Sequence, residues 1–161
     1  MKEYILATHR RVCVDKRAGE FFITIDEPGT YLKSVTLPAK RWAALMLAIT
    51  PIDESVALLQ SQQYVKLFTH VGGGFYVSVT TGFRCVDLRR FYFDSTKDSN
   101  QPTRDGIALT LSQWSLFKVI VQQIKQDFPE LSEIEHCTHR ELMELYNCRE
   151  CYPLNILPKL V

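Results

Sequence analysis

The residues of this chain whose types suggest a function are basic residues interspersed with aromatic ones. Such residues could bind a polyanion. Arginine and lysine neutralise phosphates and aromatic rings stack on bases, which is the general composition of a single-strand-binding surface. The basic candidates in the first half of the chain are Arg10, Arg11, Lys16, Arg17 and Lys33. The candidates in the second half are Tyr76, Phe83, Arg84, Arg89, Tyr92 and Arg104.

Each of these candidates has an ordinary structural alternative. The paired arginines would also suit a solvated sheet face, and Tyr76, Phe83 and Tyr92 would also suit cross-strand packing. The two tryptophans, Trp42 and Trp114, each begin an amphipathic stripe, so we expect them in the core and not in base stacking.

A second group of residues near the C-terminus has the types that bind zinc. Cys148 and Cys151 have knuckle spacing, and Cys137 and His139 could complete the set. The residues between the two pairs have the pattern of a packing helix, and a structural zinc site needs four well-placed ligands. The sequence therefore favours a chain without cofactors and leaves zinc as the alternative.

Catalytic patterns find little support. Asp26, Asp87, Asp94 and His70 show no spacing that marks a catalytic constellation. The three glycines 72–74 are not a phosphate loop, because a strand and not a helix is expected after them. We expect a protein that is not an enzyme.

The secondary-structure elements that would position these residues occur as a repeat in the sequence. Residues 34–42 read S-V-T-L-P-A-K-R-W and residues 106–114 read G-I-A-L-T-L-S-Q-W, each an alternating strand that runs into a helix opening just before a tryptophan. This repetition predicts a duplicated small fold and not one large α/β enzyme.

The pattern of the first half predicts four strands and two helices. Pro38 opens the first helix, and T-P-I-D at 50–53 predicts a new N-terminus and a second short helix that ends near Gln60. The expected strands are residues 4–8, 11–14, 20–26 and 31–37.

The second half repeats this plan. Thr110 and Gln113 predict a capped helix that Pro129 ends, and a further short helix is expected at 138–147. The expected strands are residues 65–70, 75–80, 84–93 and 107–111, with a polar loop at 94–105.

Together these elements predict an α+β fold of two ββββα repeats, each an antiparallel sheet backed by a helix. The expected division is a first repeat at 1–62, a second at 63–128 and a C-terminal extension at 129–161. A single helix on a four-stranded sheet leaves an apolar face exposed unless a partner covers it. The two repeats are therefore expected to form an intramolecular pseudo-dimer, monomeric in solution unless the C-terminal segment mediates higher assembly.

Composition is that of an ordinary globule, with 46% hydrophobic and 23% charged residues. We expect no membrane span and no signal peptide, and five cysteines favour thiols in a reducing compartment. Residues 1–41 and 63–127 each carry eight basic and five acidic residues, whereas residues 128–161 carry six acids and three bases. The basic halves suit a polyanion partner without requiring one.

Four blocks in the second half carry a family resemblance. Residues 76–79 read Y-V-S-V, residues 86–92 read V-D-L-R-R-F-Y, residues 102–109 read P-T-R-D-G-I-A-L, and Gln113 precedes Trp114. In this order the blocks resemble the single-stranded-DNA-binding domain of the transcriptional positive-cofactor-four coactivator family. The resemblance implies a four-stranded sheet backed by one helix, in which two units dimerise through their helices and grip melted or single-stranded DNA.

The resemblance also implies roles for three residues. Arg89 corresponds to the family's strand arginine, Tyr92 stands where the family has an exposed tryptophan, and Arg104 keeps one of two basic residues before the glycine. Because Arg89 and Tyr92 have opposite parity on a strand, a bulge or bend is needed to direct both at one ligand. The departures are Thr80, where the family has an arginine, and Gln101 and Asp105, where it has lysines.

We therefore expect a single-stranded DNA- or RNA-binding protein of low sequence specificity, nuclear and active in transcription or replication. The alternative is a protein–protein interaction module that kept the fold and lost the basic positions. A further alternative is that the repeats resemble the purine-rich-element-binding or Whirly folds. The family would then be different, but the expected activity would be the same. The C-terminal acids, among them Glu130, Glu133 and Glu141, belong to a segment that either completes a core or competes with nucleic acid.

Overall fold

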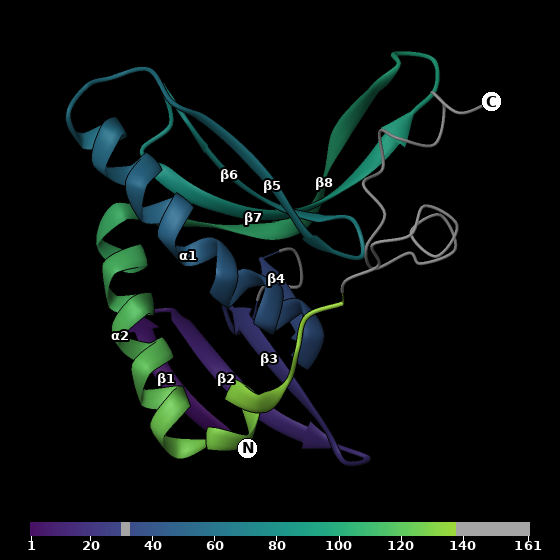
Figure 1. Cartoon of the computed structure of the whole chain (residues 1–161), viewed down its shortest axis with the longest axis vertical. Coiled ribbons are helices and arrows are strands. Elements are labelled where there is room, and N and C mark those ends of the chain that lie inside the picture. Colours follow the sequence, from purple (N-terminus) through teal and green to yellow (C-terminus); the bar gives the residue numbers. More distant parts are fainter. Residues whose placement is uncertain (30–32, 138–161) are drawn as a thin grey trace.

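The computed structural model describes residues 1–29 and 33–137, which form two four-stranded antiparallel sheets, each followed by a helix (Figure 1). This confirms the α+β fold of two ββββα units. The first unit consists of β1 (Lys2–Ala7), β2 (Arg10–Arg17), β3 (Glu20–Asp26), β4 (Ser34–Pro38) and α1 (Ala39–Gln60). The second consists of β5 (Lys66–Gly72), β6 (Phe75–Thr80), β7 (Cys85–Asp94), β8 (Ser99–Thr110) and α2 (Leu111–Asp127), followed by the short 3-10 helix η1 (Pro129–Glu133).

Alternating side chains give each sheet a buried face and an outer face. In β3, Phe21, Ile23 and Ile25 are buried and the residues between them are partly exposed. In β7, Val86 and Leu88 are buried in the same way. Successive side chains on a strand point to opposite faces, so the residues between the buried ones define the outer face of each sheet.

The duplication extends to an irregularity in the first hairpin of each unit. The register shifts between Ile5 and Ala7 where β1 pairs with β2, and between His70 and Gly72 where β5 pairs with β6. A bulge changes strand direction and twist, so a bulge at the same place in both units makes their hairpins equivalent position by position.

The structure corrects the prediction of two helices in the first unit, because α1 runs through Pro51 without interruption. A proline inside a helix removes the hydrogen bond to the carbonyl of the residue four positions earlier, here Leu47. Leu47 is 63% exposed, so this loss falls on the outer side of α1 and not in the core. Burial of Ile52 and Val56 then favours continuing the helix over starting a new one at Thr50.

The predicted loop at 94–105 is also wrong, because Ser99 to Asp105 belong to β8 and only a short turn separates β7 from β8. The outer half of this hairpin extends beyond the rest of the sheet as an arm (Figure 1). An arm away from the core has no buried face to fill, so the polar residues 99–105 can form a strand there through backbone pairing with β7. The side chain of Asp94 caps the turn by accepting hydrogen bonds from Thr96.

The helix α2 begins and ends as predicted. The side chain of Thr110 accepts from the backbone of Gln113, whose side chain accepts from the backbone of Thr110, so the capping box is present. The helix ends just before Pro129, and Leu131 in η1 is buried in the core. The helix expected at 138–147, and residues 31 and 32 of the expected fourth strand, lie outside the described residues.

A single hydrophobic core joins the two units, since each helix contacts both sheets. Trp42 of α1 packs edge-on against Phe117 of α2, and Trp114 stacks on the same ring. Both tryptophans are buried, which confirms their predicted core position. Trp114 also donates a hydrogen bond of 2.8 Å to Asp53 of α1.

Two contacts cross between the units in a reciprocal way. Gln113, which precedes Trp114, accepts a hydrogen bond from Arg10 in the first hairpin of the other unit. Arg41, which precedes Trp42, lies over the ring of Phe75 and against Gly73, in the first hairpin of the second unit. Reciprocal contacts of this kind are characteristic of a two-fold interface, here within one chain.

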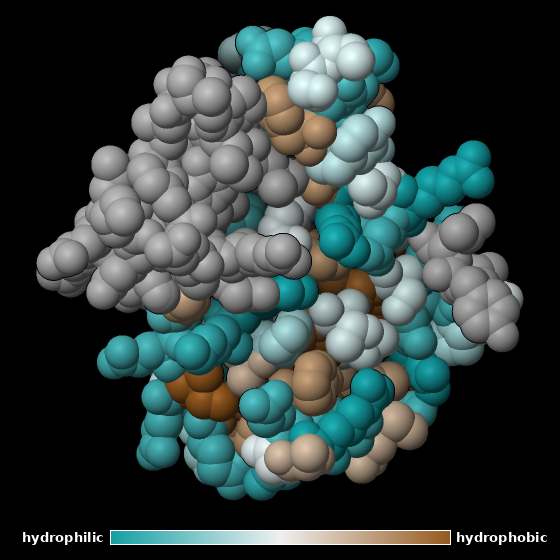
Figure 2. Space-filling model, turned by 90° about the vertical axis from the view of Figure 1, so that its right-hand side faces the viewer, coloured by the Kyte–Doolittle hydropathy of each residue, from teal (hydrophilic) through white to brown (hydrophobic). Residues whose placement is uncertain are grey.

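One 18-residue window of α1 reaches a mean hydropathy of 1.5, so by length and composition this helix could cross a membrane, unlike the expectation from sequence. In the fold, α1 contacts strands from both sheets, as the core helix of a globular protein does. Figure 2 shows a side of the molecule on which hydrophilic residues predominate and smaller hydrophobic areas lie between them.

Candidate nucleic-acid interface

A hollow of about 430 Å³ lies on the outer face of the second sheet and is bounded by two phenylalanine rings together with small, apolar and polar side chains. We call it the aromatic hollow. The strand β7 supplies every second residue from Cys85 to Phe91, because these side chains share one face. Its lining residues are Ser78, Thr80, Phe83, Cys85, Asp87, Arg89, Phe91, Pro102 and Ala108.

A second hollow of about 370 Å³ adjoins the first where the two units meet. We call it the basic hollow. Its wall brings together four of the cations that the sequence selected, two from each unit, and it shares Arg89 and Ala108 with the aromatic hollow. Its lining residues are Arg10, Lys33, Arg89, Arg104, Gly106, Ile107 and Ala108.

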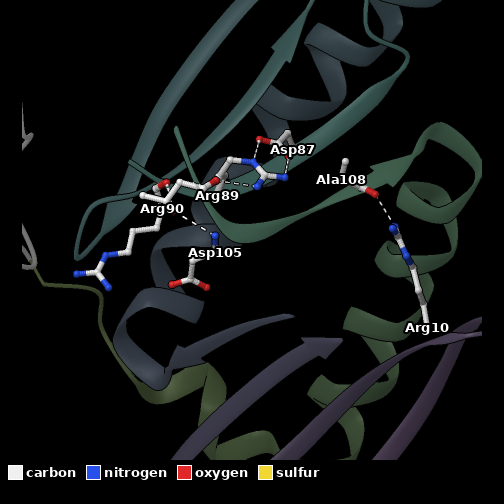
Figure 3. A network of polar contacts seen from close by, with 7 residues as sticks. Arg10, Asp87, Arg89, Arg90, Asp105 and Ala108 are labelled. Carbon is white, nitrogen blue, oxygen red and sulfur yellow. Dashed lines mark hydrogen bonds and ion pairs between the residues drawn. The ribbon is translucent and has the colours of Figure 1, made fainter. Parts of the chain in front are cut away.

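Arg89 lies on the wall that the two hollows share, and its guanidinium is held in place. It bonds both carboxylate oxygens of Asp87 at 3.2 Å and donates to the backbone oxygen of Thr103 at 2.9 Å (Figure 3). Gly106 pairs with Arg89 across the strands, and a Cβ there would lie 2.8 Å from Arg89 atoms. Glycine at this position allows the close approach.

Arg10 reaches the basic hollow from the first unit. It donates to the backbone oxygen of Ala108 (Figure 3), to Gln113 at 2.9 Å and to Glu27 at 2.7 Å. The hydrogen bond from Arg10 lowers the pKa of the Glu27 carboxyl. Lys33 lies 3.5 Å from the same carboxylate.

The basic hollow keeps an excess of positive charge. Arg10 and Lys33 share the Glu27 carboxylate, and Arg89 pairs with Asp87. Arg104 is exposed, and none of the ion pairs within residues 1–29 and 33–137 involves it. Four cations therefore have two carboxylates as their described ion-pair partners, which leaves a cationic surface for an anion.

Tyr76 is not one of the exposed rings, because it is 3% exposed and packs across strands. Its ring stacks on Phe68 at 4.2 Å between centroids and meets Phe91 edge-on. Of its two expected roles, the structure shows cross-strand packing. Phe68 covers it at the surface and is 42% exposed.

Phe83 and Tyr92 are exposed but differ in position. Phe83 lines the aromatic hollow, at the turn between β6 and β7 next to the exposed Arg84. Tyr92 is 49% exposed and does not line either hollow. A register shift lies between Arg89 and Phe91, but it does not bring Tyr92 to the face of Arg89, and Phe91 joins Arg89 at the aromatic hollow instead.

The remaining basic candidates of the first unit lie away from both hollows. Arg11 pairs with Asp26 at 3.0 Å and with Glu3 at 2.6 Å on the outer face of the first sheet. The hydrogen bond to Asp26 is the main cause that raises the pKa of Arg11. Arg17 pairs with Asp15, and Lys16 lies over the ring of Phe21.

The two outer faces differ at equivalent positions. Aligning the hairpins on their bulges matches Arg11 with Tyr76 and Glu3 with Phe68. The next strand pairing then matches Asp26 with Arg89. The aromatic cluster of the second sheet is thus replaced by an ion-pair cluster on the first, so the sheets are unequal as ligand surfaces.

Metal ligands do not gather in the described part of the chain, where no three histidine, cysteine or acidic residues are grouped as a metal site would need. Of the four candidate zinc ligands only Cys137 is described, and His139, Cys148 and Cys151 lie outside. Cys13 and Cys85 are thiols whose pKa values are raised mainly by burial.

Sequence reasoning missed Asp87, Phe91 and Pro102 as parts of the site. Two of them could have been found from the alternation of side chains along β7, since Asp87 and Phe91 share a face with Arg89. Pro102 had no such signal, because its strand was expected to be a loop. Comparisons with family models, curated proteins and solved structures gave no match for this chain.

Proposed function

We propose that this protein binds single-stranded nucleic acid along the adjoining aromatic and basic hollows. The observation that carries this proposal is the wall that they share, in which Arg89 belongs to both. A single strand has charged phosphates on one side and flat apolar bases on the other, so its binding site must present both surfaces side by side.

In this proposal the four cations of the basic hollow neutralise backbone phosphates, and Phe83 and Phe91 contact bases. Bases paired inside a duplex are stacked and cannot enter a hollow without being unpaired. The site therefore favours single strands over duplex. Its affinity falls as salt rises, because each neutralised phosphate releases counterions.

The second sheet and the junction form the binding surface, and the outer face of the first sheet does not take part. Its arginines Arg11 and Arg17 are bound to carboxylates of the same sheet, which would also repel phosphate. We infer one strand per molecule. A role in transcription or replication, without catalysis, rests on the family resemblance of the second unit.

The proposal is tested by fluorescence anisotropy with a labelled mixed-sequence single strand across a salt series. Arg104→Ala should weaken binding by about 1 kcal/mol and reduce the salt slope by about one phosphate contact. The matched control is Lys97→Ala, at the exposed tip of the β7–β8 arm, which lines neither hollow.

Equal losses in both variants would contradict the assignment of the basic hollow. Absence of binding to a single strand at low salt would overturn the function itself. The fold would then fit the alternative of a protein–protein interaction module, for which the ion-paired outer face of the first sheet is the favouring observation.

A further inference from the structure

The aromatic hollow contains one carboxylate among its polar groups. Ser78 and Thr80 carry hydroxyls that both donate and accept, so they fit any base edge. Arg89 only donates hydrogen bonds. Asp87 only accepts them when ionised, and it is the single acidic residue of the lining.

Asp87 retains acceptor capacity beyond its pairing with Arg89. Each carboxylate oxygen takes part in one contact with Arg89, at 3.2 Å. An ionised carboxylate offers about four lone-pair sites, so further donors can be accepted. Its side chain is 20% exposed, which leaves it accessible from the hollow.

Asp87 lies where the proposed site would hold bases and not the backbone. It lines the aromatic hollow with Phe83 and Phe91, and it is not part of the basic hollow. Arg89 spans both hollows and has three of its donors engaged. A base packed between the rings would therefore present its polar edge to Asp87, while phosphates lie on the other side of Arg89.

We propose that Asp87 makes the site prefer bases that carry an exocyclic amino group. The inference rests on the proposed function and adds a base preference. Binding through phosphate charge alone would show no such preference. Cytosine donates from its N4 amino group, and a carboxylate is its natural acceptor. Uracil and thymine place the O4 oxygen at the same ring position, where it meets another acceptor and is repelled.

The preference is measured with two labelled strands of equal length, oligo-dC and oligo-dU. Their bases differ in the hydrogen-bonding groups of the ring edge, and neither base carries the methyl group of thymine. We expect the protein to bind oligo-dC about fivefold or more tightly, as for other base-edge contacts. In Asp87→Asn the amide can donate to O4 as well as accept, so the ratio should fall to about one.

Asp98→Asn is the matched control, because it removes the same charge at the exposed turn of the β7–β8 arm. Asp98 has a φ of 49°, a conformation that asparagine also adopts. The Asp98→Asn variant should prefer oligo-dC over oligo-dU as strongly as the unmodified protein does. Melting curves of both variants confirm folding, since the amide introduced by Asp87→Asn keeps an oxygen for Arg89.

Equal affinity for oligo-dC and oligo-dU in the unmodified protein would overturn the inference and leave the proposed function standing. A preference that persists in Asp87→Asn would overturn the role of Asp87. Absence of binding to either strand at low salt would overturn the proposed function, and this inference with it.

Discussion

The carboxylate of Asp127 joins the two units, although its partners lie far from it in the sequence. Asp127 at the end of α2 accepts hydrogen bonds from Lys2 at 2.6 Å and from Tyr4 at 2.7 Å in β1. These contacts lower the pKa of Asp127, as the hydrogen bond from Arg10 lowers that of Glu27. Burial and the contact with Asp127 raise the pKa of Tyr4.

The first prediction is acid destabilisation that begins in the range where these groups titrate. A carboxyl whose pKa is lower in the folded state contributes stability above its unfolded-state pKa, and this stability is lost as pH falls through the folded-state value. The ordinary values are 3.8 for Asp127 and 4.5 for Glu27. The melting temperature should therefore decline below about pH 5.

Asp127→Asn should flatten part of this decline, because an amide does not titrate. Asp98→Asn, at an exposed turn, serves as the control and should keep the pH profile of the unmodified protein. An identical profile in all three proteins would show that Asp127 does not couple protonation to folding.

The second prediction concerns the close approach of Gly106 to Arg89. In Gly106→Ala the new Cβ would lie 2.8 Å from the Cα of Arg89, so the strands must separate or Arg89 must move. We expect a loss of about 1–3 kcal/mol in the free energy of unfolding, as for other overpacked positions. Chemical denaturation measures it, and the exposed neighbour Asp105→Ala should change stability by less than about 0.5 kcal/mol.

At the scale of elements, the alternation of side chains along β7 decides which aromatic residue faces the aromatic hollow. Phe91 shares the face of Arg89 and lines the aromatic hollow, whereas the resemblance had selected Tyr92. The third prediction is that Phe91→Leu weakens single-strand binding by about 1–3 kcal/mol, the usual contribution of base stacking. Leucine keeps an apolar side chain against Phe68 and Tyr76, so packing is largely preserved.

Tyr92→Leu is the matched control, because it removes a neighbouring ring that lines neither hollow. Its anisotropy titration should match that of the unmodified protein. The reverse ranking, with Tyr92→Leu weaker and Phe91→Leu unchanged, would place the bound strand on the other side of the arm.

The fourth prediction tests the continuity of α1. If a helix began at Thr50, Thr50→Ala would remove an N-cap and cost about 1 kcal/mol. In the continuous helix Thr50 is an interior residue, so Thr50→Ala should leave the free energy of unfolding unchanged or raise it slightly. Pro51→Ala restores a backbone donor for Leu47 and should be stabilising by about 1–2 kcal/mol. A loss of stability in Thr50→Ala would indicate a break in the helix.

The elements predicted correctly are those in which local pattern and burial agree. β3 and α2 have clear alternation or clear caps, and their burial follows the pattern. α1 and the β7–β8 arm were missed because local signals there compete with tertiary structure. At Pro51 the core contacts of Ile52 outweigh the proline, and in the arm backbone pairing outweighs a polar composition. Pairing of Arg10 with Ala108 joins segments that the sequence pattern does not relate.

At the scale of the whole molecule, the two units share one hydrophobic core. Each helix contacts both sheets, and Phe21 of β3 packs edge-on against Phe128 beyond the end of α2 at 5.8 Å between centroids. Reciprocal contacts from Arg10 and Arg41 join the hairpins of one unit to the helix of the other. The charge of the basic hollow depends on this arrangement, because Arg10 and Lys33 come from the first unit.

The fifth prediction is therefore a monomer that unfolds in a single step. Light scattering should give the mass of one chain, since each helix packs against the sheets of both units within the molecule. Tryptophan fluorescence reports the core through Trp42 and Trp114, and circular dichroism reports the helices, so their denaturation curves should coincide. The separate fragments 1–62 and 63–137 should remain largely unfolded, because each lacks the helix that covers its sheet from the other unit. A stable fragment 63–137 would show that the second unit folds alone, and an obligate dimer of the full chain would show that its core is completed by a second copy.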